Sequence, residues 1–365
     1  METLVSGAWQ GRRVLVTGHT GFKGAWLSLW LQAMGARVTG YALPPPTSPS
    51  LFELARVGEL VDHVEGDVRD LGHLCRVITR TRPEVIFHLA AQPLVRQSYD
   101  DPVETYATNV MGTVNLFEAA RRSGGVLAIV CVTSDKCYEN REWVWPYRET
   151  DPMGGYDPYS SSKGCAEIVA SAFRRSYFME DGPAVATVRA GNVIGGGDWA
   201  CDRLIPDLVR AFAAGAAPII RSPGAVRPWQ HVLEALGGYI MVAERLLAGD
   251  RHCATGWNFG PGDDDAQPVS WIVERMRAAW GDNAASAMAD CRPSPHEAGV
   301  LRLDSSKART ELGWRPSLGL DQAIGWIVAW HKAVTDDACA RQVTLGQIED
   351  YRGFASGRDG ALAAA

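Results

Sequence analysis

The first thirty residues constrain the fold more than any other part of this sequence. A β-branched and apolar run at residues 13–17 leads into a turn with glycines at positions 18, 21 and 24, and an apolar helical pattern follows at 25–31. In this order of elements the first glycine permits a tight turn, the second lets backbone approach a pyrophosphate, and the third lets helix and strand pack closely. The free N–H groups at the helix start then favour a phosphate. The pattern therefore predicts a dinucleotide site rather than a glycine turn without a ligand.

Strand and helix patterns alternate along the first half of the chain. Further strands are predicted at 36–41, 61–65, 83–89, 126–132 and 184–189, and long helices at 102–122 and 159–178. This alternation is typical of an α/β fold with a doubly wound parallel sheet. From residue 191 the pattern loosens, with more prolines and longer loops. We predict a Rossmann-type domain at 1–190 with returning segments from about 228–257, an interleaved, smaller C-terminal substrate-binding lobe at 191–350, and a tail at 351–365.

Composition narrows the class of protein. The chain has 365 residues, 46% of them apolar, which is ordinary globular usage, and a net charge of −6 gives no reason to expect nucleic acid or an anionic membrane as a partner. Its eight cysteines are scattered without a Cys-x-x-Cys pair, which favours free thiols in a reducing compartment over disulfides or a metal site. No apolar stretch is long enough to span a bilayer. We therefore expect a cytoplasmic enzyme without a bound metal.

A tyrosine and a lysine four residues apart are the second informative feature. Tyr159 and Lys163 would lie on one face of a helix, one turn apart. A lysine beside a tyrosine favours the phenolate and lowers a pKa that is about 10 in a free side chain. Such a tyrosine can act as a general base near neutral pH. Alone the pair is common on solvated helix faces, but together with the glycine turn it predicts catalysis.

Small and polar residues follow several of the predicted strands. Gly18, Asp67, Ala90, Thr133 and Arg189 all stand at carboxyl ends, where an open parallel sheet binds its ligands. We therefore expect them around one crevice. Asp67 either binds the adenine side of a dinucleotide or only caps the following helix, and the sequence leaves both open.

Six short runs carry a resemblance to a known family. They are residues 17–24 (TGHTGFKG), 133–138 (TSDKCY), 154–163 (GGYDPYSSSK), 191–199 (GNVIGGGDW), 227–232 (RPWQHV) and 257–261 (WNFGP). The chain resembles the extended short-chain dehydrogenases/reductases and, within them, the CDP-D-glucose 4,6-dehydratases, over roughly residues 9–332. The glycine turn and the Tyr/Lys pair specify only the superfamily, whereas the runs at 133–138 and 227–232 are specific to a much smaller group of proteins within it.

The resemblance implies an internal redox cycle on a hexose. NAD⁺ would accept a hydride from sugar C4 while Tyr159 takes the 4-hydroxyl proton and Ser134 hydrogen-bonds that hydroxyl; water would then leave across C5–C6, and the hydride would return to C6. Asp135 and Lys136 match the acid and base positions of the elimination. Their opposite charges lower the pKa of Asp135 and raise that of Lys136, whereas an acid needs a raised pKa and a base a lowered one. Desolvation therefore has to outweigh the effect of the charges. The alternative for Lys136 is that it only orients or stabilises the enolate.

The resemblance also implies the cofactor, NAD, held by the glycine turn and the strand ends. The residues expected to bind it are Gly18, Thr20, Gly21, Phe22, Lys23, Gly24, Asp67, Val68, Leu89, Ala90, Ala91, Thr108, Thr133, Tyr159, Lys163 and Arg189. NAD-selective folds often end the second strand with an acidic residue that binds the ribose 2′-hydroxyl, and residues 40–42 (GYA) provide none. We choose NAD because an internal redox cycle needs no exchange with the NADPH pool.

The expected substrate is a nucleotide sugar, CDP-glucose. Its phosphates, ribose and sugar would contact Gln92, Asn192, Arg203, Arg221, Arg227 and His296. Arg227 stands in a proline-rich setting where a guanidinium can bind a pyrophosphate through two hydrogen bonds, whereas Arg203 and Arg221 could equally be surface arginines. The helices at 102–122 and 157–178 suggest a homodimer or a dimer of dimers built on a four-helix bundle, as in the family.

Two other functions remain open at this stage. A different NAD-dependent nucleotide-sugar dehydratase or a 4-epimerase would share the fold, the cofactor and Tyr159, but an epimerase needs no acid and base at C5 and C6. Asp135 and Lys136 therefore argue against an epimerase. A non-catalytic NAD-binding regulator on the same fold would leave the tyrosine–lysine pair unexplained.

Overall fold

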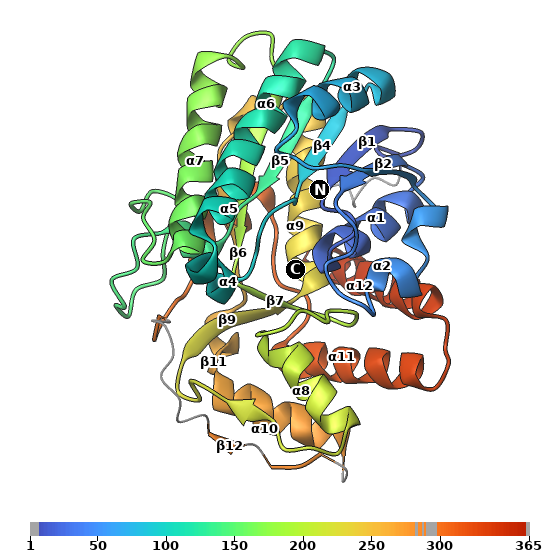
Figure 1. Cartoon of the computed structure of the whole chain (residues 1–365), viewed down its shortest axis with the longest axis vertical. Coiled ribbons are helices and arrows are strands. Elements are labelled where there is room, and N and C mark those ends of the chain that lie inside the picture. Colours follow the sequence, from blue (N-terminus) through green and yellow to red (C-terminus); the bar gives the residue numbers. More distant parts are fainter. Residues whose placement is uncertain (1–6, 282–283, 287, 290–297, 363–365) are drawn as a thin grey trace.

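A parallel sheet forms the centre of the molecule in the computed structural model, which describes residues 7–281, 284–286, 288–289 and 298–362. The sheet has seven strands in the order β10-β6-β5-β4-β1-β2-β3, and Figure 1 shows it in the upper part of the molecule. The strands are β1 (Arg13–Thr17), β2 (Arg37–Ala42), β3 (Asp62–Glu65), β4 (Val85–His88), β5 (Ala128–Val132), β6 (Ala184–Ala190) and β10 (Gly256–Phe259).

The central strands are buried on both faces, and their sequences reflect it. Every residue of β4, β5 and β6 is buried, which is why these strands read as continuous apolar runs rather than as alternating ones. All pairings in this sheet are parallel. The strand order reverses between β1 and β4, so the ligand crevice of a doubly wound sheet is expected beyond their carboxyl ends. The predicted fold class is confirmed.

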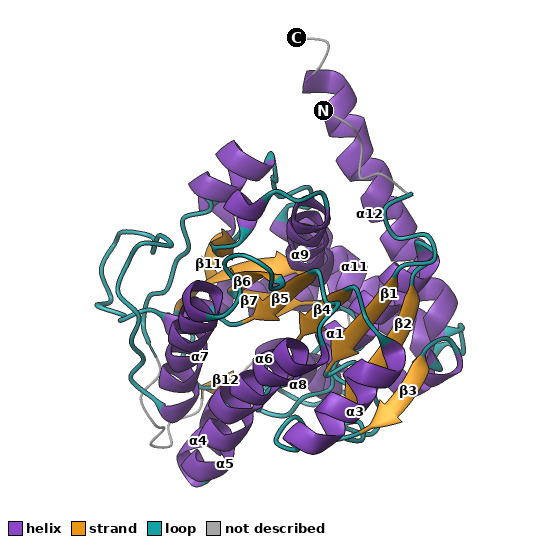
Figure 2. Cartoon of the chain, turned by 90° about the horizontal axis from the view of Figure 1, so that it is seen from above, coloured by secondary structure: helices purple, strands orange, loops and turns teal. Residues whose placement is uncertain are grey.

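Helices cover both faces of the sheet, as the view from above shows (Figure 2). One face carries α3 (Leu71–Thr81), α4 (Val95–Asp100), α5 (Pro102–Tyr106), α6 (Gly112–Ser123) and α7 (Pro158–Ser176). The other carries α1 (Phe22–Ala33), α2 (Leu51–Leu54), α9 (Val232–Leu247) and α12 (Ala340–Leu362). The apolar segment that follows the glycine turn is α1, and its residues 24–31 are all buried.

The C-terminal part forms a second layer of structure beyond the carboxyl ends of the strands, at the bottom of Figure 1. It holds β7 (Asn192–Ile194), α8 (Leu204–Ala213), β8 (Ile219–Ile220), β9 (Val226–His231), β11 (Ala266–Pro268), α10 (Val269–Trp280), β12 (Met288–Ala289) and α11 (Leu320–Thr335). Between β9 and β11 the chain returns to the large sheet, adding α9 to its face and β10 to its edge. The exact division into two domains stays a prediction.

The helix predicted at 102–122 is not continuous. A π-helical segment, Ala107–Met111, separates α5 from α6. Gly112 follows it at a tight contact, because a Cβ there would lie 2.7 Å from Cγ2 of Val68. Insertions of this kind are frequent at functional sites, and this one lies beside α7.

Candidate active site

The glycine turn has the geometry of a phosphate cradle. Gly18 has φ +76°, and a Cβ there would lie 2.7 Å from the backbone nitrogen of Ala90, so both backbone and space require glycine. A Cβ at Gly24 would lie 2.1 Å from the Gly18 carbonyl oxygen, which is why the helix can pack so closely on the turn. The turn thereby lies directly against residues 89–90 at the end of β4, as the predicted crevice requires.

Gly21 differs from the other two, and the difference tests whether a dinucleotide fits. Its φ is −80°, and a Cβ there would meet only the Gly18 carbonyl oxygen, at 3.5 Å. Neither the backbone nor the packing of the protein requires glycine at this position. Since α1 also begins without a side-chain cap, its first N–H groups receive no acceptor from Gly21 and are available to a pyrophosphate. The residues therefore fit the cofactor that the sequence predicts.

Many of the predicted site residues surround a cavity of about 300 Å³ at the carboxyl ends of β5 and β6. Those that line it are Phe22, Lys23, Thr133, Ser134, Asp135, Lys136, Tyr159, Asn192, Arg203, Arg221 and Arg227. They come from distant parts of the chain, because α1, the end of β5, the start of α7 and the second layer all meet there. The cavity brings the candidate base together with the candidate acid.

Tyr159 and Lys163 stand on consecutive turns of α7, as predicted, but their electrostatics differ from expectation. Burial raises the pKa of Tyr159 to about 12, opposed by a hydrogen bond with Ser134 and by the charge of Arg203. The ammonium of Lys163 is buried and donates to the Val132 carbonyl at 3.3 Å. Burial lowers the pKa of Lys163. The prediction that Lys163 lowers the Tyr159 pKa is wrong for the protein alone, because burial dominates both groups.

Asp135 has the environment of a proton donor. Its side chain is 3% exposed, and burial raises its pKa against the charges of Lys136, Arg227 and Lys23. Ser134 donates a hydrogen bond to Oδ1 at 3.0 Å, whereas Oδ2 is buried without a partner among the described residues. Lys136 is half-buried and lines the same cavity. Desolvation therefore prevails over the adjacent charge at Asp135, as an acid requires.

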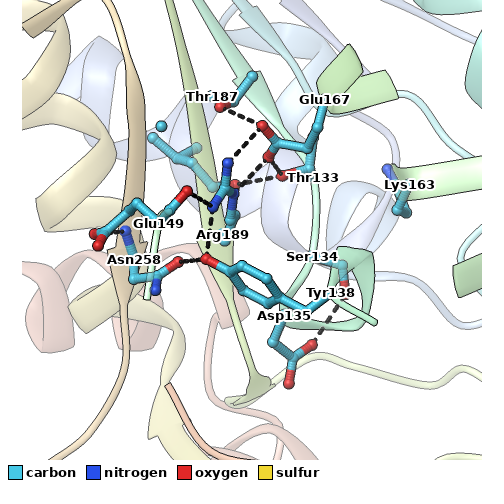
Figure 3. Close-up of polar contacts among 12 residues, drawn as sticks. Thr133, Ser134, Asp135, Tyr138, Glu149, Lys163, Glu167, Thr187, Arg189 and Asn258 are labelled. Carbon is cyan, nitrogen blue, oxygen red and sulfur yellow. Dashed lines mark hydrogen bonds and ion pairs between the residues drawn. The ribbon is translucent and has the colours of Figure 1, made fainter. Parts of the chain in front are cut away.

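Beneath these residues lies a buried ion pair, shown in Figure 3. Arg189 donates to both carboxylate oxygens of Glu167, each at 2.8 Å, and also to the Tyr138 hydroxyl. The hydroxyls of Thr133 and Thr187 donate to the same carboxylate. Arg189 was predicted to bind the cofactor; this is corrected, because its guanidinium is committed to Glu167 and Tyr138.

Gln92 requires a second correction, since it was predicted to contact substrate. Its amide oxygen accepts from the backbone of Leu94 at 2.5 Å, and its amide nitrogen donates to Leu94 and Thr105 at 3.1 and 2.9 Å. The side chain is buried and shapes the loop after β4 instead of facing the cavity. Asn109, in the π-helical segment, clamps the same loop to α7 by bonding the Gln92 backbone and the Ser162 hydroxyl. The sequence analysis missed Asn109, whose only signal was a polar residue inside a helical pattern.

The candidate substrate arginines already have partners within the protein: Arg203 and Arg221 pair with acidic side chains, and Arg227 with backbone carbonyls. Arg203 donates to Asp198 at 3.0 Å and Arg221 to Asp202 at 2.7 Å. Arg227 is buried and donates to the carbonyls of Val226 and Gly299. Asp198, buried on the cavity wall, was missed by the sequence analysis although it stands in the quoted run 191–199. His296 lies outside the described residues.

The remaining candidate cofactor residues lie around the glycine turn and strand ends. The Thr20 hydroxyl donates to the Leu43 carbonyl at 2.9 Å, and the Thr108 hydroxyl donates to Glu104 at 3.3 Å. The Asp67 carboxylate accepts from Arg69, whose hydrogen bond lowers the Asp67 pKa. Asp67 does not cap the following helix; Asp70 does, accepting from His73 at 2.8 Å. Val68, Leu89 and Ala91 are at or near the ends of β3 and β4, and their contact with a cofactor stays a prediction.

Within the described ranges, no helix is long and apolar enough to cross a membrane. The same residues contain no group of three or more histidine, cysteine, aspartate or glutamate side chains arranged to hold a metal ion.

Comparison with known proteins is consistent with this geometry. A curated CDP-glucose 4,6-dehydratase of Salmonella typhimurium is 59% identical over 348 residues, which are 94% of this chain and 97% of the relative. A dTDP-glucose 4,6-dehydratase of Xanthomonas campestris is 27% identical over 87% of this chain and 92% of its own. Among solved structures, the dTDP-glucose 4,6-dehydratase DesIV of Streptomyces venezuelae, with NAD and TYD bound, has a TM-score of 0.76 at 26% identity, covering 88% of this chain and 97% of its own.

A family model described as GDP-mannose 4,6 dehydratase matches residues 15–325, which include the glycine turn, the cavity and most of the second layer. With this match, and with more than half of its residues identical to those of one curated dehydratase, the chain belongs to the GDP-mannose 4,6 dehydratase family, within the extended short-chain dehydrogenases/reductases.

Proposed function

We propose that this chain is an NAD-dependent CDP-glucose 4,6-dehydratase, a hydro-lyase that forms CDP-4-keto-6-deoxy-D-glucose and water. The observation that carries the proposed chemistry is the cavity lined by both Tyr159 and a buried Asp135, one of whose oxygens has no partner among the described residues. An epimerase has no use for a neutral acid at that place. The choice of the cytidine nucleotide follows the 59% identical relative, whose name specifies it.

NAD, when bound, supplies the acceptor for the hydrogen of sugar C4 and its donor to C6. In the first stage Tyr159 takes the proton of the 4-hydroxyl, which the neighbouring Ser134 hydroxyl holds in place. The high pKa of free Tyr159 means that the phenolate has to be stabilised once ligands are bound, and Arg203 already acts in this direction.

The second stage eliminates water. The 4-ketone acidifies the proton at C5, and Lys136 is the residue proposed to remove it. Asp135 donates its proton to the C6 hydroxyl, so that the C6–O bond breaks, the C5=C6 double bond forms and water leaves. Burial raises the pKa of Asp135, which is the direction that an acid requires. The residues proposed to bind the diphosphate and ribose line the same cavity; they are Arg203, Arg221, Arg227 and Asn192.

A homodimer, or a dimer of dimers, is part of the proposal. The helices α5, α6 and α7 pack together on one face of the molecule. These helices and the π-helical segment expose apolar side chains that a second copy could cover: Val103 is 78% exposed, Met111 51% and Ile168 60%. Ile168→Glu should then shift the light-scattering mass to that of a monomer. We place the enzyme in the cytoplasm, where NAD and nucleotide sugars are available.

A substrate panel tests the proposed activity. The purified chain is incubated with NAD and CDP-, dTDP-, GDP- or UDP-glucose, and the 4-keto-6-deoxy product is measured by its alkaline absorbance and mass. We expect turnover with CDP-glucose and none with Tyr159→Phe, the matched variant that lacks only the acidic hydroxyl. Conversion of glucose to galactose without loss of water would identify an epimerase instead.

A further inference from the structure

One oxygen of Asp135 has an environment that the proposed reaction does not by itself explain. Oδ1 accepts from Ser134, but Oδ2 is buried and accepts from no described residue. Leaving a buried polar atom without a partner costs about 1–3 kcal/mol, and such atoms are rare enough to need a reason. The reason has to lie in the groups that surround Oδ2.

Gly191, directly after β6, is one of these groups. A Cβ at Gly191 would lie 3.2 Å from Asp135 Oδ2, 2.9 Å from the Pro228 carbonyl oxygen and 2.4 Å from Pro228 Cγ. Non-bonded carbons normally stay about 3.5–4.0 Å apart. Gly191 is not among the residues with a left-handed φ, so a side chain is excluded by space and not by the backbone.

Pro228 packs against Gly191, and the register of two short strands puts it there. In the parallel pairing of β7 with β9, Asn192 stands opposite Trp229, so the preceding residues of each strand also face one another. Proline has no N–H to donate, and glycine has no side chain. Gly191, backed by Pro228, therefore borders Oδ2 without a side chain that could hydrogen-bond it, and Pro228 has no N–H to offer.

We propose that Gly191 and Pro228 are positioning residues of the elimination: they form a dry slot that holds the Asp135 carboxyl group and leaves Oδ2 for the C6 hydroxyl of the substrate. This inference rests on the proposed function. It assigns a role to the runs 191–199 and 227–232 that is separate from binding the nucleotide.

The charges around the slot are consistent with this role. Three cations act on Asp135: Lys136 of its own segment, Lys23 of α1 and Arg227 of β9. Two tyrosines also interact with it, Tyr159 of α7 and Tyr239 of α9. Burial of the carboxyl group in the slot raises the pKa of Asp135, against the effect of the three cations. After the proton passes to the leaving hydroxyl, the same cations stabilise the carboxylate that remains.

Gly191→Ala tests the slot, with Gly224→Ala as its matched control. A Cβ at Gly224 meets nothing within 4 Å, and this glycine also has no left-handed φ. We expect Gly191→Ala to slow elimination by about 10²-fold, the usual effect of a misplacement of about 1 Å. Oxidation at C4, followed as NADH formed in a single turnover, should change less than about threefold in both variants. Equal loss of both stages in Gly191→Ala would overturn the inference.

A measurement on the free enzyme separates this inference from the proposed function. The infrared signal of the protonated Asp135 carboxyl group, identified by its loss in Asp135→Asn, is followed against pH. The methyl group of Gly191→Ala should press the carboxyl group toward solvent, so its signal should disappear at a lower pH than in the wild type or in Gly224→Ala. An unchanged titration would refute the slot even if the enzyme proved to act on another substrate.

Pro228→Ala covers the case in which Gly191→Ala fails to fold. It opens the slot to water without crowding it and should lower the titration pH of Asp135 in the same direction. If the wild type shows no dehydratase activity while both titrations shift as expected, the slot stands and the proposed reaction fails. If dehydration is normal and neither titration shifts, only the slot fails.

Discussion

Two buried carboxylates near the ends of β5 and β6, Glu167 and Asp135, have nearly the same exposure and opposite properties. Glu167 is 6% exposed and Asp135 3% exposed. Burial raises the pKa of both, but at Glu167 the charge and hydrogen bonds of Arg189, with those of Thr133 and Thr187, outweigh burial and lower it. At Asp135 one hydrogen bond from Ser134 and the charges of Lys136, Arg227 and Lys23 do not outweigh burial, and the pKa is raised.

The comparison shows that burial alone does not decide the role of an acidic side chain. A buried carboxylate whose oxygens are all hydrogen-bonded stays charged and stabilises the fold. One that has an unbonded oxygen beside a cavity has a raised pKa and can serve as a proton donor. Figure 3 shows the two arrangements in one view, with Glu167 inside its network and Asp135 outside it. The network also ties the end of β5 to β6 and β10 through Tyr138 and Asn258, and so fixes the backbone that carries Asp135.

The largest effect is expected for Asp135→Asn. Asparagine keeps the shape but cannot deliver an acidic proton, so elimination should fall by about two to four orders of magnitude. Oxidation at C4 should persist, and rapid mixing with CDP-glucose should show NADH absorbance that rises and then stalls. Product formed at a nearly normal rate would mean that Asp135 is a structural group like Glu167, and the acid would have to be sought elsewhere in the cavity.

Glu167→Gln should affect stability rather than one chemical stage. Removing one partner of a buried ion pair leaves the other charge uncompensated, at a cost of about 3–5 kcal/mol. Urea unfolding should show this loss, and both half-reactions of the surviving folded enzyme should slow together. A variant of normal stability with a selective loss of elimination would erase the distinction between the two carboxylates.

The sequence predicted most of the fold because its signals there are local. The strand, glycine turn and helix at residues 13–31 lie next to one another in the chain, and their geometry follows from the backbone freedom of glycine and from apolar runs. Tyr159 was predicted from its spacing to Lys163, and the roles of Ser134, Asp135 and Lys136 from the resemblance carried by residues 133–138. The structure then added that these four line one cavity.

What the sequence could not predict depends on pairing across long distances. The sequence around a polar residue after a strand is the same whether its side chain contacts a ligand or another side chain of the protein. Arg189 pairs with Glu167, which stands on a helix that was predicted separately. Gln92 was misassigned for the same reason, since its partners include Thr105 of α5. The slot of Gly191 and Pro228 requires the register of β7 and β9, for which the sequence holds no signal.

Lys136→Met should have a smaller effect than Asp135→Asn. Methionine keeps the length of the side chain and removes the amine, and because Lys136 is half-buried, water can replace part of its function. We expect about a 10²-fold loss of elimination, at the low end for a missing base. Solvent deuterium should also enter C5 more slowly in Lys136→Met, whereas Asp135→Asn should leave that exchange largely intact. Unchanged exchange in Lys136→Met would leave Lys136 only an orienting or stabilising role.

The smallest effect, on stability against pH, discriminates most directly between the two carboxylates. The folded-state pKa of Asp135 is raised, so the folded protein binds its proton more tightly than the unfolded chain, and Asp135 lowers stability once pH rises above its unfolded value of about 3.9. Asp135→Asn should therefore be more stable than the wild type near pH 7, because asparagine carries no charge in the same buried place. That gain should shrink as pH falls toward about 4.

Glu167 should give the opposite trend. Its folded-state pKa is lowered, so its contribution to stability is present above its unfolded value of about 4.3 and is lost as pH falls through the folded value. The loss of stability in Glu167→Gln should accordingly be greatest near pH 7 and smaller in acid. Urea titrations of both variants and the wild type at several pH values measure the two slopes. Slopes of the same sign would mean that the free Oδ2 of Asp135 is paired in solution, which would remove the physical basis for its role as the acid.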